Sequence, residues 1–153
     1  MLLDRNDISG LIPHAGYMVL LESVLACDPL TLRARAISHR DPGNPLRRGR
    51  ALSAVTGAEY AAQAAAVHGA LSAGEATRPG FLAMIRDLYW TRDRLDAVPG
   101  DLGIRVELIS AQSDSTLYDF TLDAGSEPLL QGRLAVFFPD SPRAHETGAS
   151  HRR

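Results

Sequence analysis

One stretch of the chain strongly favours helix but has almost no polar surface. It spans residues 55–71, VTGAEYAAQAAAVHGAL, and contains seven alanines. Alanine favours helix in any setting, but these alanines point in nearly every direction around a helix axis. Only Glu59, Gln63 and His68 supply a polar side, whereas a helix on a protein surface needs a continuous polar face. The stretch therefore predicts a thin helix over about residues 56–73 that is buried on all sides.

The remainder of the chain predicts strands. Six segments have the length, apolar content or alternation of strands: residues 18–26, 31–37, 81–90, 102–111, 116–123 and 129–138. With one long helix the chain cannot build a parallel βαβ sheet, so the helix and an antiparallel sheet must bury each other. A sheet curls closely around a helix only where that helix is thin. We therefore predict an α+β protein with the hotdog fold, in which an antiparallel sheet wraps around one long central helix.

Composition limits the classes of function. The 153 residues suffice for one well-buried domain, which we expect over residues 1–140, followed by a disordered tail over residues 141–153. A net charge of -2 gives no reason to expect a nucleic-acid or membrane partner. The single Cys27 cannot form an internal disulfide, and no segment resembles a signal peptide or a membrane span, so we expect a cytoplasmic protein. No metal or nucleotide motif occurs, so no metal or cofactor is expected.

Four segments resemble the bacterial 3-hydroxyacyl-acyl-carrier-protein dehydratases, in the same order along the chain. They are LIPHAGYMVLLESVL (11–25), GAEYAAQAAA (57–66), RPGFLAMIRDLYW (78–90) and AVPGDLGIRVEL (97–108). The second is most similar to the G-x-E-Y-M-A-Q-A helix start of the aryl-polyene-type dehydratases. The resemblance covers about residues 11–139.

This resemblance implies a fold, a reaction and a partner. The family has the hotdog fold, usually as a dimer with two active sites at the interface, and we expect a homodimer or a dimer-based oligomer. Its members eliminate water from a 3-hydroxyacyl thioester carried on the phosphopantetheine arm of acyl carrier protein, which leaves a trans-2-enoyl thioester. Such reactions serve lipid, polyene or polyketide biosynthesis. The chemistry needs a base for the α-proton and an acid for the leaving hydroxyl, and in the family these come from different subunits.

Glu59 lies at the position of the family's helix-borne acid, so the resemblance implies that it protonates the leaving hydroxyl. The same residues also have a structural interpretation. Thr56-Gly57-Ala58-Glu59 fits a capping box, in which the third helical residue binds back to the N-cap amide. The positive end of the helix dipole favours a carboxylate anion, whereas an acid catalyst must carry its proton. The catalytic role therefore requires burial to outweigh the dipole.

Two histidines are candidates for the base. His14 follows Pro13 in the first matching segment, and the aryl-polyene-type relatives keep this Pro-His motif. His39 begins HRDPGNP, which is similar to the segment that carries the base in other dehydratases, but it has one extra residue and lies too far ahead of Glu59. We favour His14, with His39 as one alternative and a site without a catalytic histidine as the other. His68, on the helix nine residues after Glu59, is expected in the core or at the end of the substrate tunnel.

Further residues are candidates to bind the substrate. Gln63 lies four residues after Glu59, on the same helix face, and either orients that acid or satisfies backbone groups of the surrounding strands. Gly57, with the amides near Ala54 and Val55, is a candidate to hold the thioester oxygen. The acyl tunnel is expected to be lined by Tyr17, Met18, Gly80 and Phe81, and their alternative is a place in the ordinary core.

A basic cluster and two other functions stay open. Arg47, Arg48 and Arg50 precede the helix and form either a solvated loop or a docking site for acidic acyl carrier protein or its phosphopantetheine phosphate. The hotdog fold also suits a thioesterase, in which Glu59 would activate water, and a non-catalytic subunit that binds acyl chains.

Overall fold

The computed structural model describes residues 1–13, 16–74 and 80–139. Two helices and one six-stranded sheet make up its regular structure. They are α1 (Arg5–Leu11), β1 (Ser23–Cys27), β2 (Thr31–Ala36), α2 (Gly57–Ala73), β3 (Phe81–Trp90), β4 (Leu102–Ala111), β5 (Ser115–Ala124) and β6 (Glu127–Phe137). Three short 3-10 turns, η1 (Gly16–Met18), η2 (Ser38–Arg40) and η3 (Ala54–Thr56), connect them. The predicted tail begins at residue 141, which lies outside the described residues.

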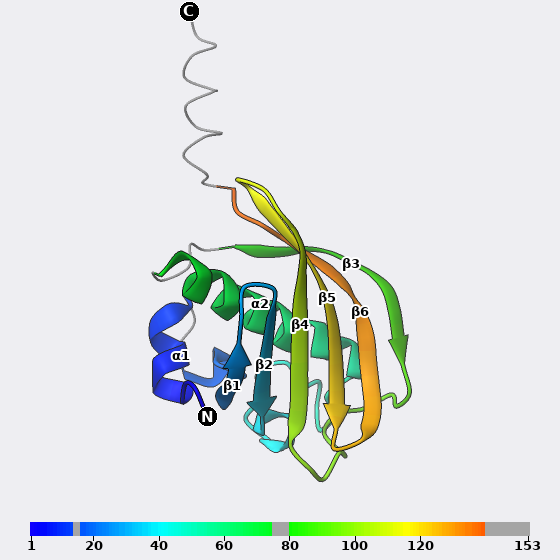
Figure 1. Cartoon of the computed structure of the whole chain (residues 1–153). Helices are drawn as coiled ribbons and strands as arrows, with labels where there is room; N and C mark the ends of the chain where they lie inside the picture. Colours follow the sequence, from blue (N-terminus) through cyan, green and yellow to red (C-terminus); the bar gives the residue numbers. More distant parts are fainter. Residues whose placement is uncertain (14–15, 75–79, 140–153) are drawn as a thin grey trace, which may run out of the picture.

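The sheet is antiparallel throughout, with the strand order β1-β2-β4-β5-β6-β3. It curves around α2, and α1 packs at the β1 end (Figure 1). β3 is a sheet edge that pairs only with β6. The predicted α+β hotdog fold, a sheet wrapped around one long helix, is confirmed.

The small side chains of α2 let the sheet approach it closely. A Cβ atom on Gly57 would lie 2.5 Å from Leu130 Cδ2 and 3.0 Å from Leu122 Cδ2, which is closer than atoms can pack. Most of the helix is buried, but one stripe of its surface is not. The residues of this stripe follow each other at intervals of three or four: Glu59, Ala62, Ala66, Gly69 and Ala73. The helix is therefore buried on every side except one narrow face.

The start of α2 differs from the predicted capping box. Thr56 has helical backbone angles and makes no side-chain cap bond; its hydroxyl instead donates to the Ser53 carbonyl at 2.6 Å. The turn η3 precedes the helix, and Ser53 caps that turn by accepting from the Val55 amide. The cap thus lies one turn earlier than the sequence suggests, and Glu59 has no part in it.

The first predicted strand is shorter than expected. Residues 18–26 were predicted, whereas β1 covers Ser23–Cys27. The preceding residues Val19, Leu20 and Leu21 are buried without belonging to a strand. Their backbone is held from within by α2, through the side chain of Gln63.

Candidate active site

A narrow pocket of about 80 Å³ runs along the exposed stripe of α2. It lies between α2, the segment before β1, and the strands β3 and β6. Its lining is mostly apolar: Pro13, Met18, Leu20, Leu46, Glu59, Ala62, Gln63, Ala66, Gly80, Leu82, Val136 and Phe138. Four of the predicted site residues, Met18, Glu59, Gln63 and Gly80, are thus brought together. Apart from Glu59 and Gln63 the lining is apolar, which is the usual character of a small-molecule site.

Glu59 is the acidic residue of this pocket. It is exposed in the first turn of α2 and also lines a second, more open groove on the other side. Within the described part of the chain its carboxylate accepts no hydrogen bond and pairs with no cation. The side chain is therefore free to contact a ligand that enters from either side.

Gln63 holds the backbone of the segment before β1 and makes no described hydrogen bond to Glu59. Its Oε1 accepts from the amides of Leu20 at 2.7 Å and Leu21 at 3.2 Å. Its Nε2 donates to the carbonyl of Met18 at 2.8 Å. These bonds fix the wall of the pocket ahead of β1. Gln63 thus satisfies backbone groups, as in the second interpretation above, but those of the segment before β1 and not those of a strand.

His14 lies outside the described residues, so no contact of its ring is described. Its neighbour Pro13 lines the same pocket as Glu59. On the other side, Tyr17 belongs to the turn η1, next to Met18 of the pocket wall. Of the described residues nearest to His14 in the sequence, Pro13 and Met18 line the pocket.

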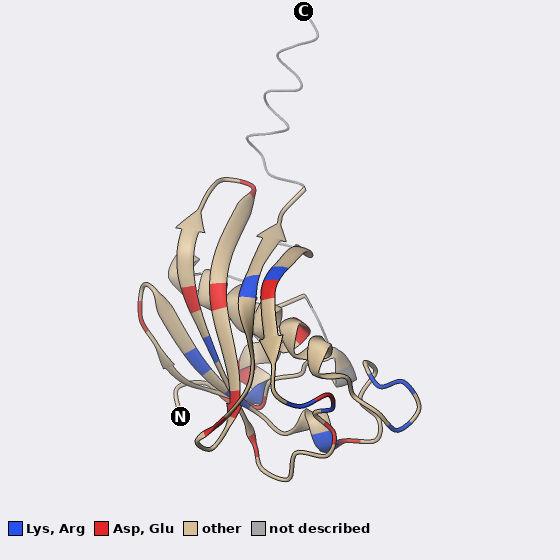
Figure 2. Ribbon diagram, turned by 90° about the vertical axis from the view of Figure 1, so that its right-hand side faces the viewer, with Lys and Arg blue, Asp and Glu red and all other residues tan. Residues whose placement is uncertain are grey.

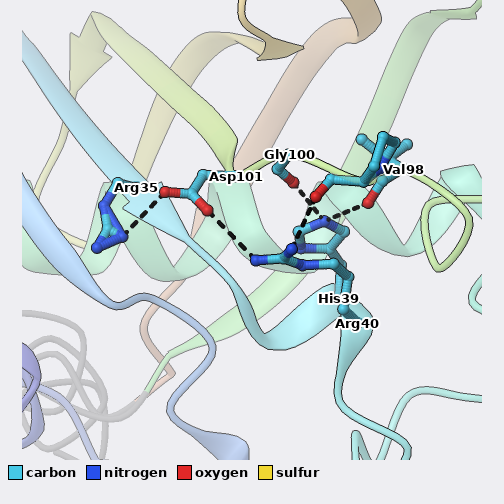
Figure 3. A network of polar contacts seen from close by, with 7 residues as sticks. Arg35, His39, Arg40, Val98, Gly100 and Asp101 are labelled. Carbon is cyan, nitrogen blue, oxygen red and sulfur yellow. Dashed lines mark hydrogen bonds and ion pairs between the residues drawn. The ribbon is translucent and has the colours of Figure 1, made fainter.

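His39 is placed elsewhere. Its ring is fully buried, and Nε2 lies 3.1 Å from the Val98 carbonyl and 2.9 Å from the Gly100 carbonyl. The next residue, Arg40, pairs with Asp101 (Figure 3). Burial lowers the pKa of His39, while the two carbonyls act in the opposite direction. His39 anchors the loop before β4, and it does not line the pocket that contains Glu59.

His68 is a core residue, as expected. Its Nε2 lies 2.9 Å from the Asp28 carbonyl and its Nδ1 lies 2.8 Å from the Tyr118 hydroxyl. Because a carbonyl can only accept, Nε2 carries the proton and Nδ1 accepts from the tyrosine. Burial raises the pKa of Tyr118 to about 12, so its hydroxyl keeps the proton that it donates. The bond to Asp28 ties the β1–β2 turn to α2, and the bond to Tyr118 ties α2 to β5.

A buried polar network beneath α2 was not foreseen from the sequence. The Tyr60 hydroxyl accepts from Asn44 Nδ2 at 2.9 Å and lies 2.9 Å from Ser38 Oγ. Ser38 in turn donates to the Leu20 carbonyl at 2.8 Å. The network fixes the segment between β2 and α2 against the pocket wall. A signal existed, because a tyrosine inside an apolar helix needs a partner for its hydroxyl.

The amides at the start of α2 already have partners. The Ala54 amide donates to the Asp93 carbonyl at 2.8 Å, and the Val55 amide to Ser53 Oγ at 3.3 Å. The Gly57 amide donates to the carbonyls of Ala54 and Val55. Gly57 itself packs against the sheet and does not line the pocket. This arrangement leaves none of the three to hold a thioester oxygen.

Phe81, a metal site and a membrane span were also considered in the sequence. Phe81 is 62% exposed on β3 and does not line the pocket. Within the described residues, no three His, Cys, Asp or Glu side chains lie close enough together to hold a metal ion. In the same part of the chain, no helix is long and apolar enough to cross a bilayer.

The fold is that of a hotdog protein, and its apolar pocket carries one carboxylate, that of Glu59. The sequence model of the ApeP-like family, described as ApeP dehydratase, matches residues 6–147. The chain belongs to the ApeP-like dehydratase family and is a dehydratase. The predicted resemblance to the aryl-polyene-type dehydratases is confirmed. No curated protein matches the chain.

Solved structures share the fold. The dehydratase heterocomplex ApeI:P from Xenorhabdus doucetiae superposes with a TM-score of 0.78 at 20% identity, over 92% of this chain and 95% of that chain. A mutant thioesterase from Pseudomonas aeruginosa gives a TM-score of 0.53 at 13% identity, over 75% and 78% of the two chains. Thioesterase superfamily member 2 from Mus musculus gives 0.53 at 10% identity, over 74% and 79%. At these identities the likeness concerns the fold alone.

Proposed function

We propose that this dehydratase removes water from 3-hydroxyacyl thioesters carried on acyl carrier protein, in the assembly of a polyene chain. The observation that carries the proposal is Glu59, a carboxylate without a partner among the described residues, at the mouth of an apolar pocket. The family model spans both Glu59 and His14. The proposal includes a cytoplasmic location and needs no cofactor.

The proposed chemistry is an elimination across C2 and C3 of the acyl group. A ring nitrogen of His14 takes the proton from C2, and the electron pair of that C–H bond forms the C2=C3 double bond. The C3–O bond breaks, and the protonated Glu59 donates its proton to the leaving hydroxyl, which departs as water. The products are the trans-2-enoyl thioester, an imidazolium and a carboxylate, and one proton transfer between the two side chains restores the site.

Glu59 is exposed in the single chain, and the removal of a carboxyl group from water favours its protonated form. A partner subunit that covers the stripe of α2 would supply this burial. β3 offers such a partner an unpaired edge, on which Tyr89 is 63% exposed and Trp90 is 43% exposed. We therefore propose a dimer through this edge, with His14 of one subunit acting together with Glu59 of the other. The relative from Xenorhabdus doucetiae is a heterocomplex, so a different hotdog subunit is the alternative partner.

The test is a dehydration assay with a 3-hydroxyacyl carrier protein on three variants. Glu59→Gln and His14→Ala should each lower kcat by at least about 100-fold, because general acid or base catalysis contributes that much or more. His39→Ala serves as the comparison, since His39 does not line the pocket. Full activity in Glu59→Gln would refute the mechanism, and a loss confined to His39→Ala would move the base to that residue. Release of free thiol without enoyl product would identify a thioesterase instead.

A further inference from the structure

The polar network beneath α2 connects two walls of the pocket. Leu20 and Leu46 both line the pocket, although one precedes β1 and the other precedes α2. The Leu46 amide donates to Asn44 Oδ1 at 2.9 Å, and the Leu20 carbonyl accepts from Ser38 Oγ at 2.8 Å. The hydroxyl of the fully buried Tyr60 contacts both Asn44 and Ser38. A continuous chain of hydrogen bonds therefore runs from one wall to the other through this hydroxyl.

The direction of each hydrogen bond follows from the chemistry of the two ends. A carbonyl can only accept, so Ser38 Oγ uses its one proton on the Leu20 carbonyl. The Tyr60 hydroxyl, 2.9 Å away, therefore donates to Ser38 Oγ, and it accepts from Asn44 Nδ2 at 2.9 Å. The second proton of Nδ2 goes to the Ser38 carbonyl at 2.9 Å. Burial raises the pKa of Tyr60, so its hydroxyl keeps the proton that the chain needs.

The backbone of Leu20 is held on both sides by α2. Its amide donates to Gln63 Oε1 at 2.7 Å, and its carbonyl is connected through Ser38 to Tyr60. Leu20 belongs to no strand, so no ladder of the sheet holds its backbone. The hydrogen bonds that fix this wall against the helix of Glu59 therefore come from two side chains of that same helix.

Neutral groups make all of these contacts. α2 contains no lysine or arginine and one carboxylate, that of Glu59, and its ribbon is mostly tan in Figure 2. Removing the Tyr60 hydroxyl would leave a proton of Asn44 and a lone pair of Ser38 without their partner, which is costly in a buried place. Tyr60 itself does not line the pocket. Its loss would thus act on the pocket only by letting the two walls shift.

We propose that Tyr60 is a positioning residue that sets which acyl chains the pocket accepts, because its hydroxyl holds the walls of Leu20 and Leu46 at a fixed separation. The inference rests on the proposed function, in which the acyl chain enters this pocket. The pocket measures only about 80 Å³, so a small shift of one wall removes contacts along the chain. A long chain loses many such contacts, and a short chain loses few.

The experiment measures chain-length preference, which is the ratio of kcat/KM for 3-hydroxydecanoyl carrier protein to that for 3-hydroxybutyryl carrier protein. The fraction of folded enzyme cancels in this ratio, so a variant that is only less stable leaves it unchanged. Tyr60→Phe should lower the ratio by about tenfold, because a misfit of one methylene group in an apolar pocket changes kcat/KM by that much. The fall should come mainly from a higher KM for the longer chain.

The matched control is Tyr118→Phe. Tyr118 is also buried, and its hydroxyl also contacts a side chain of α2, that of His68, but neither residue lines the pocket. This variant should leave the ratio unchanged. Equal falls in both variants would mean that any lost hydrogen bond of α2 alters the pocket, and an unchanged ratio in Tyr60→Phe would mean that its hydroxyl does not position the walls. Either result overturns the proposal.

Ser38→Ala tests the same chain at its next link. It removes the donor to the Leu20 carbonyl and keeps the whole Tyr60 side chain. It should lower the ratio as Tyr60→Phe does, and the double variant should lower it no further, because changes within one network are not additive. Additive effects would mean that the two residues act separately, against the proposal. If Tyr60→Phe yields no folded protein, Ser38→Ala and the same control decide the question.

A binding measurement separates this inference from the proposed reaction. The probes are decanoyl and butyryl derivatives of pantetheine with an amide in place of the thioester, which lack the 3-hydroxyl group and cannot be dehydrated. In calorimetric titrations the full-length wild type should bind the longer chain more tightly, and Tyr60→Phe should reduce that preference. If no thioester is dehydrated but this result holds, the reaction is wrong and the role of Tyr60 stands. If the wild type binds both probes equally, the role of Tyr60 is wrong.

Discussion

At the scale of single residues, Gln63 illustrates how a side chain near an active site acts through the backbone. Replacing it by leucine leaves two buried amides and one carbonyl, those of Leu20, Leu21 and Met18, without their partner. Buried groups left in this state are costly, so Gln63→Leu should lower the free energy of unfolding by about 3 kcal/mol. Urea denaturation measures the loss.

The control for this variant is Gln131→Leu, on the exposed surface of β6. It should change the free energy of unfolding by less than about 0.5 kcal/mol. Equal effects of the two variants would show that the three hydrogen bonds of Gln63 do not stabilise the pocket wall.

His39 should make stability depend on pH. Its pKa is lowered in the folded protein, chiefly by burial, from an unfolded value of about 6.5. Below that value the unfolded chain binds a proton that the folded chain does not, so the free energy of unfolding falls with falling pH until the folded pKa is reached. The slope contributed by His39 is at most about 1.4 kcal/mol per pH unit, and it is absent above the unfolded value.

Denaturation curves at several pH values between 7 and 5 test this dependence. His39→Gln keeps a donor for the Val98 or Gly100 carbonyl but cannot titrate. Its stability should fall less steeply with acidification than that of the wild type. Equal slopes would mean that His39 takes up a proton in the folded protein as readily as in the unfolded chain.

The residue scale also shows where sequence reasoning ends. The spacing between Glu59 and Gln63 indicates a shared helix face, but two roles are compatible with it, because spacing along a helix says nothing about what packs opposite. Tyr60 and Asn44 form a hydrogen bond across 16 positions of sequence. Such a pair becomes visible only once the segment before α2 has its three-dimensional path.

At the scale of elements, two glycines of α2 provide a matched test of how closely the sheet approaches. A Cβ on Gly57 would meet buried Leu130 and Leu122 at 2.5 and 3.0 Å, whereas a Cβ on Gly69 would have nothing within 4 Å. In a helix interior, where Gly69 lies, alanine is favoured over glycine by about 1 kcal/mol. Gly69→Ala should therefore raise the free energy of unfolding by about 0.5–1 kcal/mol. Gly57→Ala should lower it by about 1–2 kcal/mol, because overpacking outweighs propensity.

Thermal or urea unfolding of both variants checks the sign of each change. A stabilising Gly57→Ala would mean that Leu130 moves aside without cost. It would also weaken the argument that a thin helix is required for the sheet to wrap around it.

Elements differ in how well the sequence predicts them. The strands from β2 onward and the helix α2 were predicted within a few residues, because their apolar patterns are long and regular. α1 was missed, although Asp4 and Asp7 form a capping box at its start. The capping box that was predicted, at Thr56, was wrong because the turn η3 moves the first cap back to Ser53. Short capping motifs are ambiguous when the preceding turn is unknown.

At the scale of the whole molecule, the sequence predicted the hotdog fold but not the order of strands. Alternation of apolar residues indicates which face of a strand is buried and does not indicate its neighbour. β3 follows α2 in the chain and lies at the edge beyond β6. This position matters for the proposed dimer, because it leaves a strand with one unpaired edge beside the pocket and the exposed Glu59.

The dimer proposed for this edge makes a quantitative prediction about shared active sites. If His14 of one subunit acts with Glu59 of the other, a mixed dimer of His14→Ala and Glu59→Gln chains contains one site with both changes and one site with neither. Random mixing places half of the chains in such dimers, so two nearly inactive variants, co-refolded in equal amounts, should together recover about a quarter of wild-type activity. The measurement is the dehydration rate per chain, with each variant refolded alone as the control.

Without recovery, acid and base belong to one chain, as the shared position of Pro13 and Glu59 in one pocket would permit. Recovery that disappears when Tyr89→Lys is present in both chains would further assign the interface to β3, since charge on an edge strand opposes pairing.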